Sequence, residues 1–121
     1  MGKSNLNGAW GEALAAQYLQ KKRYMIVATN YRCRFGEIDL VAKKGKMLAF
    51  VEVKLRTNLS HGLPREYVTR AKQQRIRTTA EVFLAENELD LTARFDVAEV
   101  YTDEAHSAQH TKIEYIENAF Q

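Results

Sequence analysis

Three charged residues interrupt two apolar stretches that otherwise read as strands. Asp39 lies within "EIDLVAK", and Glu52 and Lys54 lie within "MLAFVEVKLR". Side chains alternate across a strand, so Glu52 and Lys54 project from one face while their apolar neighbours project from the other. Two carboxylates and an ammonium on one face are residue types that can hold a divalent cation against a phosphate. The pattern therefore points to metal-assisted chemistry at a phosphate.

The turn "KKGK" between the two stretches leaves two antiparallel registers open. In the tighter register Asp39 lies opposite Phe50, and in the wider one it lies opposite Glu52. Directly opposed residues point to the same face, so Asp39, Glu52 and Lys54 share a face in both cases. A slip of one residue would separate them, but it would also scramble both apolar faces.

Burying these charges without partners would cost several kcal/mol, and a divalent cation such as Mg²⁺ or Mn²⁺ offsets that cost. Glu12, among small residues in "GAWGEALAAQ", is a candidate third acid. Lys54 is placed to hold a water molecule or the attacked phosphate. A structural ion pair from Lys54 to Glu52 or Asp39 at an exposed sheet edge is the alternative. Glu37 is expected to be solvated or an auxiliary ligand.

The elements that must position these residues follow from periodicity and turn signals. A helix is expected over residues 7–22, with Asn5 or Asn7 as its cap. Separately, Arg94 and Asp96 are expected to form a structural pair or to cap an element. The order α-β-β-β-α-β-β predicts one mixed α/β domain over residues 1–121. The remaining predicted elements are strands 24–31, 37–43 and 47–56, a helix over 66–87, and strands 92–102 and 112–120.

Charge is divided unevenly along the chain. Residues 1–80 carry 16 Lys and Arg against 5 Asp and Glu, whereas residues 81–121 carry 2 against 10. This asymmetry indicates a face that binds a polyanion, although two ordinary solvated surfaces would produce it as well. Lys72 and Gln73 could reach a phosphate from the second helix, unless Lys72 lies along the sheet. Further candidate phosphate contacts are Arg65, Arg70, Arg75 and Arg77 on or near that helix, and Arg32 and Arg34 before the hairpin.

Length and composition limit the class of protein. A chain of 121 residues accommodates one hydrophobic core, and its single cysteine, Cys33, excludes an internal disulfide and a cysteine-based zinc site. No apolar run approaches the roughly 18–20 residues that cross a bilayer, and no leader pattern is present. We therefore expect a cytoplasmic protein that does not bind a membrane.

The acid in the first helix, Asp39 and the triplet Glu52-Val53-Lys54 together resemble the PD-(D/E)xK endonuclease-like superfamily, in its Holliday-junction-resolvase-like branch. Ile38 stands where that pattern usually has proline. More narrowly, the chain resembles the YraN family of small uncharacterised bacterial proteins over nearly its full length. The matching stretches are "GAWGEALAAQYL", "NYRCRFGEIDLVAKKGKMLAFVEVKLR", "HGLPREYVTRAKQQRI" and "ARFDVAEV".

The resemblance implies a restriction-endonuclease-like mixed sheet flanked by helices, with the metal site at the hairpin. It implies that Asp39, Glu52 and the Val53 carbonyl bind Mg²⁺ or Mn²⁺, that Glu12 is a further ligand or orients water, and that Lys54 is the catalytic lysine. The leading hypothesis is a metal-dependent endonuclease acting on DNA, including branched DNA, for which a homodimer would pair two active sites. Two alternatives stay open: a nucleic-acid-binding module with a vestigial or partner-activated site, and an interaction protein that uses the acidic second half.

Overall fold

The computed structural model describes residues 2–56, 68–103 and 105–121, with side chains from residue 8 onward. In chain order the elements are α1 (Gly2–Lys21), β1 (Met25–Cys33), β2 (Gly36–Lys44), β3 (Met47–Arg56), α2 (Arg70–Glu86), β4 (Thr92–Tyr101), a short 3₁₀ helix η2 (Ala108–His110) and β5 (Lys112–Phe120).

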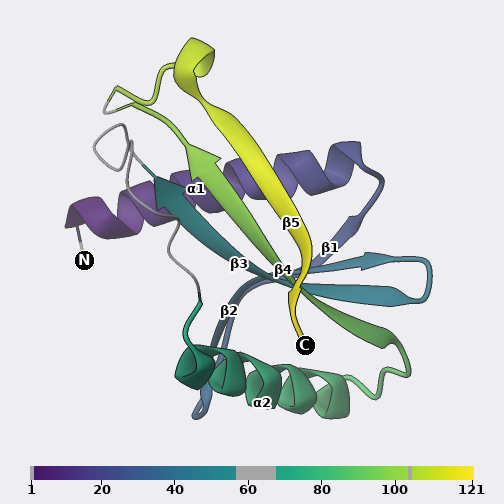
Figure 1. The fold of residues 1–121 in the computed structure, drawn as a ribbon. Helices are drawn as coiled ribbons and strands as arrows, with labels where there is room; N and C mark the ends of the chain where they lie inside the picture. The colour runs from purple at the N-terminus through teal and green to yellow at the C-terminus, as the bar shows by residue number, and fades with distance from the viewer. Residues whose placement is uncertain (1, 57–67, 104) are drawn as a thin grey trace.

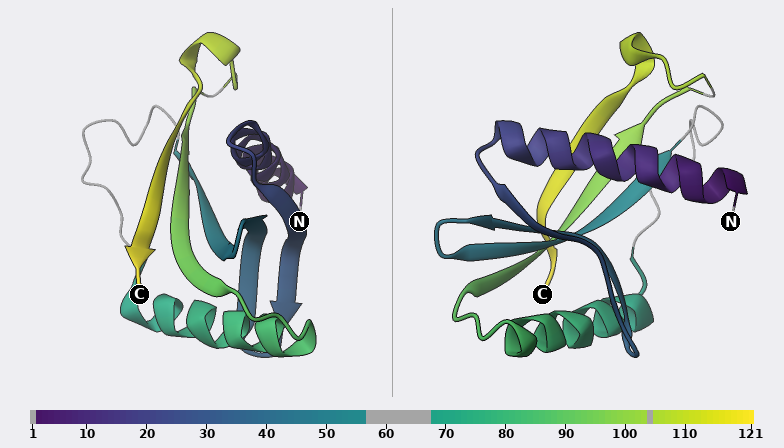
Figure 2. Two further views of the ribbon diagram at one scale, coloured as in Figure 1. Left: turned by 90° about the vertical axis from the view of Figure 1, so that its right-hand side faces the viewer. Right: turned by 180° about the vertical axis from the view of Figure 1, so that it is seen from behind.

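The strands form one twisted mixed sheet with α1 and α2 on opposite sides of it (Figures 1 and 2). The strand order is β1-β2-β3-β4-β5, in which β3 and β4 are parallel and all other neighbours are antiparallel. Parallel neighbours need a crossover connection, and α2 lies within the one from β3 to β4. The predicted fold class and order of elements are confirmed.

Each helix covers its own hydrophobic cluster. Leu48 and Phe50 of β3 pack in the cluster that includes Ile76 and Phe83 of α2. Ala49 and Val51, the alternate residues of the same strand, pack instead in the cluster that includes Leu19 of α1. Strand β3 is therefore apolar on both faces because it is covered on both. A charged residue in this strand needs a specific reason for its position.

The β2–β3 hairpin adopts the wider of the two registers. Lys43 lies opposite Leu48, and Lys44 lies opposite Met47. The two-residue turn between them contains Gly45 with a φ of 61°, a conformation that glycine adopts without steric cost. Continuing this register places Asp39 at the level of Glu52.

Strand β2 separates from β3 at Asp39. The last pair between these strands is Leu40 with Val51, whereas β2 continues beside β1 to Gly36 and β3 continues beside β4 to its end. Asn30, next to Asp39 on β1 in this register, has a φ of 50°. The first part of β2 bends with β1 toward α2 (Figure 2), so a gap opens between β2 and β3.

The helix starts differ from the sequence-based expectations. Helix α1 begins at Gly2, so Asn5 and Asn7 lie inside it and the predicted cap is wrong. Helix α2 begins at Arg70, where the Thr69 hydroxyl accepts a hydrogen bond from the Lys72 N–H at 3.2 Å. Threonine is a favoured residue at this position because its oxygen satisfies a free amide of the first turn.

The predicted structural role of Arg94 and Asp96 is confirmed. The Arg94 Nη2 atom lies 2.8 Å from Asp96 Oδ2, and the Asp96 side chain is fully buried. Asp96 also accepts hydrogen bonds from the Tyr115 hydroxyl at 2.5 Å and from the Asn118 N–H at 2.9 Å. Arg94 in turn donates to the Tyr24 hydroxyl at 2.6 Å. This network joins β4 to β5 and to the residue preceding β1.

Within the described ranges, no helix is long and apolar enough to cross a membrane.

Candidate metal and phosphate site

A cleft of about 300 Å³ lies where β2 separates from β3, beneath the first turns of α2. It brings together two of the acids expected from the sequence, Asp39 and Glu52. It also contains a lysine and an arginine from α2. The residues that line it are Gly36, Glu37, Asp39, Glu52, Lys72, Arg75 and Ile76.

The Asp39 side chain accepts a hydrogen bond from a backbone N–H of β3 that lies beyond the last pair with β2. The Val53 N–H donates to Asp39 Oδ2 at 2.8 Å. Val53 lies beyond the last β2–β3 pair, where β2 backbone no longer supplies a ladder partner. Because the N–H and C=O of one strand residue point to the same edge, we expect the Val53 carbonyl to face this gap as well.

The pKa of the Asp39 carboxyl is raised to about 7. Desolvation by burial is the largest cause, and the nearby Glu52 carboxylate is the next. The hydrogen bond from the Val53 N–H acts in the opposite direction. The folded chain therefore holds Glu52 close enough to disfavour charge on Asp39.

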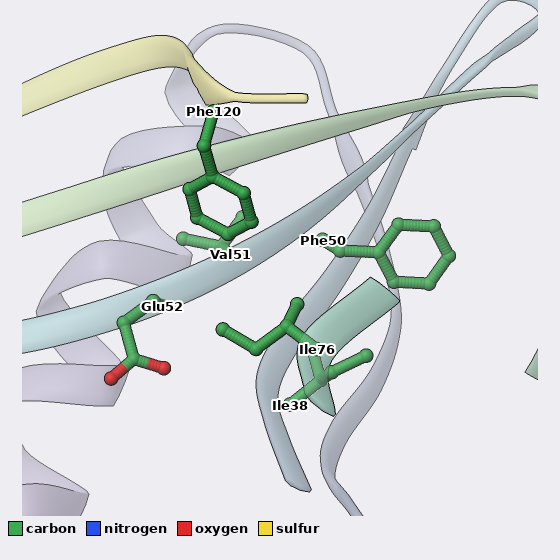
Figure 3. A pocket seen from close by; sticks show the side chains of 6 residues that line it. All are labelled: Ile38, Phe50, Val51, Glu52, Ile76 and Phe120. Atoms are coloured by element: carbon green, nitrogen blue, oxygen red, sulfur yellow. The ribbon is translucent and has the colours of Figure 1, made fainter. Parts of the chain in front are cut away.

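Glu52 is nearly buried, and it is paired with a lysine from α2. Only 9% of the residue is exposed, and its Oε2 atom lies 2.5 Å from Lys72 Nζ. Beside it is an apolar recess too narrow to admit water, lined by Ile38, Phe50, Val51, Ile76 and Phe120. The Glu52 carboxylate points out of this recess, away from the rings of Phe50 and Phe120 (Figure 3).

Glu12 does not line the cleft. It is half-buried on α1, and its Oε1 atom accepts a hydrogen bond from Asn30 Nδ2 at 3.0 Å. Burial raises the pKa of Glu12, while the bond from Asn30 lowers it. Its charge also acts on Asp39. Among the described residues, no group of three or more His, Cys, Asp or Glu side chains is arranged to hold a metal ion. The cleft is thus lined by Asp39, Glu52 and the exposed Glu37, whereas Glu12, the third acid expected from the sequence, lies outside its lining.

Lys54 also lies outside the lining of the cleft. It is partly buried on β3, opposite Glu99 of the parallel strand β4. The lysine that reaches Glu52 is Lys72, which was expected from the sequence to contact a phosphate or to lie along the sheet, and not to pair with Glu52. A signal was available: Lys72 precedes Ile76 by one helical turn, on the stripe that faces the sheet.

The other predicted phosphate contacts divide into two groups. Arg75 is exposed and lines the cleft, and Arg70 is exposed at the start of α2. The side chains of Gln73 and Arg77 instead form hydrogen bonds within the protein. The Gln73 side chain donates to the Val68 carbonyl at 2.8 Å, and Arg77 donates to the Gln121 carbonyl and to Gln74 Oε1.

Near the β1–β2 turn, Arg32 forms an exposed ion pair with Glu37 at 3.6 Å, and the Arg34 guanidinium lies 4.9 Å from the centre of the Phe35 ring. Arg65 lies outside the described residues.

The donor set of the cleft fits a hard divalent cation. Asp39 and Glu52 offer carboxylate oxygens, and the Val53 carbonyl is expected at the same gap. Mg²⁺ and Mn²⁺ prefer oxygen ligands of this kind and retain several waters, so two carboxylates and a carbonyl are sufficient. A cation there would relieve the repulsion that raises the pKa of Asp39.

Comparison with known proteins places the chain among small bacterial relatives. A family model described as "Uncharacterised protein family UPF0102" matches residues 11–100. A UPF0102 protein of Alkaliphilus metalliredigens is 46% identical over 93% of this chain and 96% of its own length. One from Geobacter metallireducens is 47% identical over 94% and 91%, and one from Flavobacterium psychrophilum is 38% identical over 99% and 98%. UPF0102 is the YraN family, so the resemblance to that family is confirmed.

Proposed function

The chain belongs to the uncharacterised protein family UPF0102, and from the geometry of its cleft we propose that it is a divalent-metal-dependent nuclease. The observation that carries this proposal is the pair formed by Asp39 and Glu52, two adjoining carboxylates in a cleft that also contains Lys72 and Arg75. A carboxyl whose pKa is raised by burial and by a second acid beside it, as that of Asp39 is, is characteristic of metal and catalytic sites.

In this proposal Asp39, Glu52 and the Val53 carbonyl hold Mg²⁺ or Mn²⁺. The bound ion would supply Lewis acidity toward a phosphate oxygen and toward water. The protein's own contribution is to position charge. The Val53 N–H fixes the Asp39 carboxylate, and the apolar wall beside Glu52 keeps water away from one side of the site. The resemblance assigns Lys54 as the catalytic lysine and Glu12 as a further ligand or water-orienting acid.

Nucleic acid is the proposed substrate because the cleft is built from the basic part of the chain. All its lining residues fall within the first 80 positions, where 16 Lys and Arg stand against 5 Asp and Glu. Arg75 and Arg70 would contact backbone phosphates, which gives salt-sensitive binding with little dependence on sequence. DNA, including branched DNA, is the proposed class.

A cleavage panel tests the proposal. Labelled linear, nicked and branched DNA and linear RNA are incubated with the wild type, Glu52→Gln and Glu81→Gln, in Mg²⁺, Mn²⁺ or EDTA. Glu81 is an exposed residue of α2 outside the cleft, so E81Q is the matched control. We expect metal-dependent cleavage by the wild type and E81Q, and a loss of at least a hundredfold in E52Q.

Binding of the same ligands, followed by fluorescence anisotropy, separates the hypotheses. Retained binding by E52Q with lost cleavage supports the nuclease. Salt-sensitive binding without cleavage of any substrate by the wild type would overturn the nuclease and favour a binding module.

A further inference from the structure

Lys72 forms an ion pair with Glu52, whose carboxylate a metal ion would need as a ligand. Its Nζ atom lies 2.5 Å from Glu52 Oε2, and the two residues come from different elements, α2 and β3. The lysine side chain is 41% exposed, whereas the glutamate side chain is 9% exposed. The more solvent-accessible member of the pair is therefore the lysine, and the more buried member is the glutamate.

The backbone beneath Lys72 is anchored at the start of α2. Its N–H donates to the Thr69 hydroxyl, and the neighbouring Gln73 side chain donates to the Val68 carbonyl. Release of Glu52 by Lys72 consequently requires only rotation about the bonds of the lysine side chain, which is long and flexible. The helix and the sheet can remain in place.

Lys72 supplies Glu52 with the positive charge that a divalent cation would otherwise supply. Asp39 lines the same cleft, so the cleft holds a second carboxylate besides the one that the Lys72 ammonium contacts. A divalent cation that binds both carboxylates would offset the charge of both, whereas Lys72 contacts only Glu52 of the two. A divalent cation bound there would compete with Lys72 for the Glu52 carboxylate.

We propose that Lys72 is an exchangeable counter-ion of Glu52: it occupies the carboxylate in the metal-free protein, leaves it when a divalent cation binds, and then contacts a phosphate of the substrate in the same cleft. This inference rests on the proposed function. It assigns one residue two successive partners, which a fixed structural ion pair would not have. Binding of the metal ion and contact of Lys72 with the substrate phosphate are then two steps of one rearrangement.

Calorimetric titration of Mn²⁺ into the full chain tests the exchange. The variants are Lys72→Met, which removes the competing charge, Lys72→Arg, which keeps it, and Arg75→Met, which removes a charge from the same cleft. We expect K72M to bind Mn²⁺ about tenfold or more tightly than the wild type, because a charged hydrogen bond no longer has to break. K72R should bind within about threefold of the wild type, and R75M should change affinity by about threefold at most. Thermal unfolding establishes that each variant is folded, and Lys72→Gln replaces K72M if that variant is not.

The outcomes separate this inference from the proposed function. Mn²⁺ binding by the wild type with no gain in K72M overturns the exchange and leaves the metal site intact. Binding by K72M but not by the wild type supports both. An absence of binding in every variant overturns both.

A second measurement follows Lys72 directly. The ¹³Cε–¹Hε signal of Lys72 is recorded during titration with Mg²⁺, and we expect it to shift toward the position of an exposed lysine. A signal that stays unchanged at saturating Mg²⁺ contradicts the exchange.

Discussion

At the scale of single residues, the carboxylate of Asp39 makes two interactions that usually belong to different groups. It replaces a missing β-ladder partner for the Val53 N–H, and it faces Glu52 across the cleft. The hydrogen bond fixes the position of the carboxylate, and the neighbouring Glu52 makes its ionised form less favourable. A residue that only stabilised the hairpin would not need a second acid beside it.

The raised pKa of Asp39 predicts how stability depends on pH in the metal-free protein. The carboxyl has a pKa near 3.8 in the unfolded chain and about 7 when folded, so between these values the folded protein holds a proton that the unfolded chain has lost. The stabilising contribution is complete below about pH 4 and is lost as pH rises through about 7. Asp39→Asn removes this titration but keeps an acceptor for Val53.

Urea unfolding at several pH values checks this expectation. Relative to the wild type, D39N should gain stability steadily between pH 4 and pH 8. Asp90→Asn, at an exposed position, serves as the control and should show no such trend. A constant difference between D39N and the wild type across this range would show that burial of Asp39 is not linked to its charge.

At the scale of elements, strand β4 is tied to β5 through Asp96. This fully buried carboxylate is bonded to Arg94, Tyr115 and Asn118. Removing one partner of a buried ion pair leaves the other without compensation, which costs about 3–5 kcal/mol. Asp96→Ala should therefore lower the free energy of unfolding by about this amount.

Urea denaturation of the metal-free protein measures the loss, with the exposed Asp90→Ala as a control expected within about 0.5 kcal/mol of the wild type. A cost below about 1 kcal/mol for D96A would mean that the network is incidental to the fold.

Helix α2 is the element expected to contact phosphate. Arg75 lines the cleft and is exposed, so Arg75→Ala should weaken nucleic-acid binding for every sequence alike. The slope of the logarithm of affinity against the logarithm of salt concentration should fall by about one, because one phosphate contact is lost. Lys112→Ala, on the exposed edge strand β5, is the matched control. Equal slopes for R75A and the wild type would exclude this face of α2 as a contact.

The strands and the hairpin could be predicted from the sequence because their alternation and turn signals are local. The strand 112–120 agrees with β5 residue for residue, and one of the two registers left open is the observed one. The separation of β2 from β3 could not be predicted, since it depends on the bend at Asn30 and on the approach of α2. For the same reason the partner of Glu52 was missed: Lys72 is 20 residues away in the chain.

At the scale of the whole molecule, the site lies where α2 meets the sheet. The cleft takes Asp39 from β2, Glu52 from β3 and Lys72 from α2, while α1 on the opposite side of the sheet carries Glu12. Strand β3 pairs with the parallel strand β4 over its whole length but with β2 only as far as Val51, so β3 stays in the sheet where β2 leaves it. The basic first part of the chain builds the cleft, and the acidic second part supplies β4 and β5.

Paramagnetic broadening by Mn²⁺ tests whether Asp39 and Glu52 bind a divalent cation together. Amide signals of the full chain are recorded while substoichiometric Mn²⁺ is added to the wild type and to Glu52→Gln. We predict that signals of residues 38–40 and 51–54 disappear first in the wild type and persist in E52Q at the same Mn²⁺ concentration. Broadening centred elsewhere, or equal broadening of these signals in E52Q, would show that Asp39 and Glu52 do not share a metal ion.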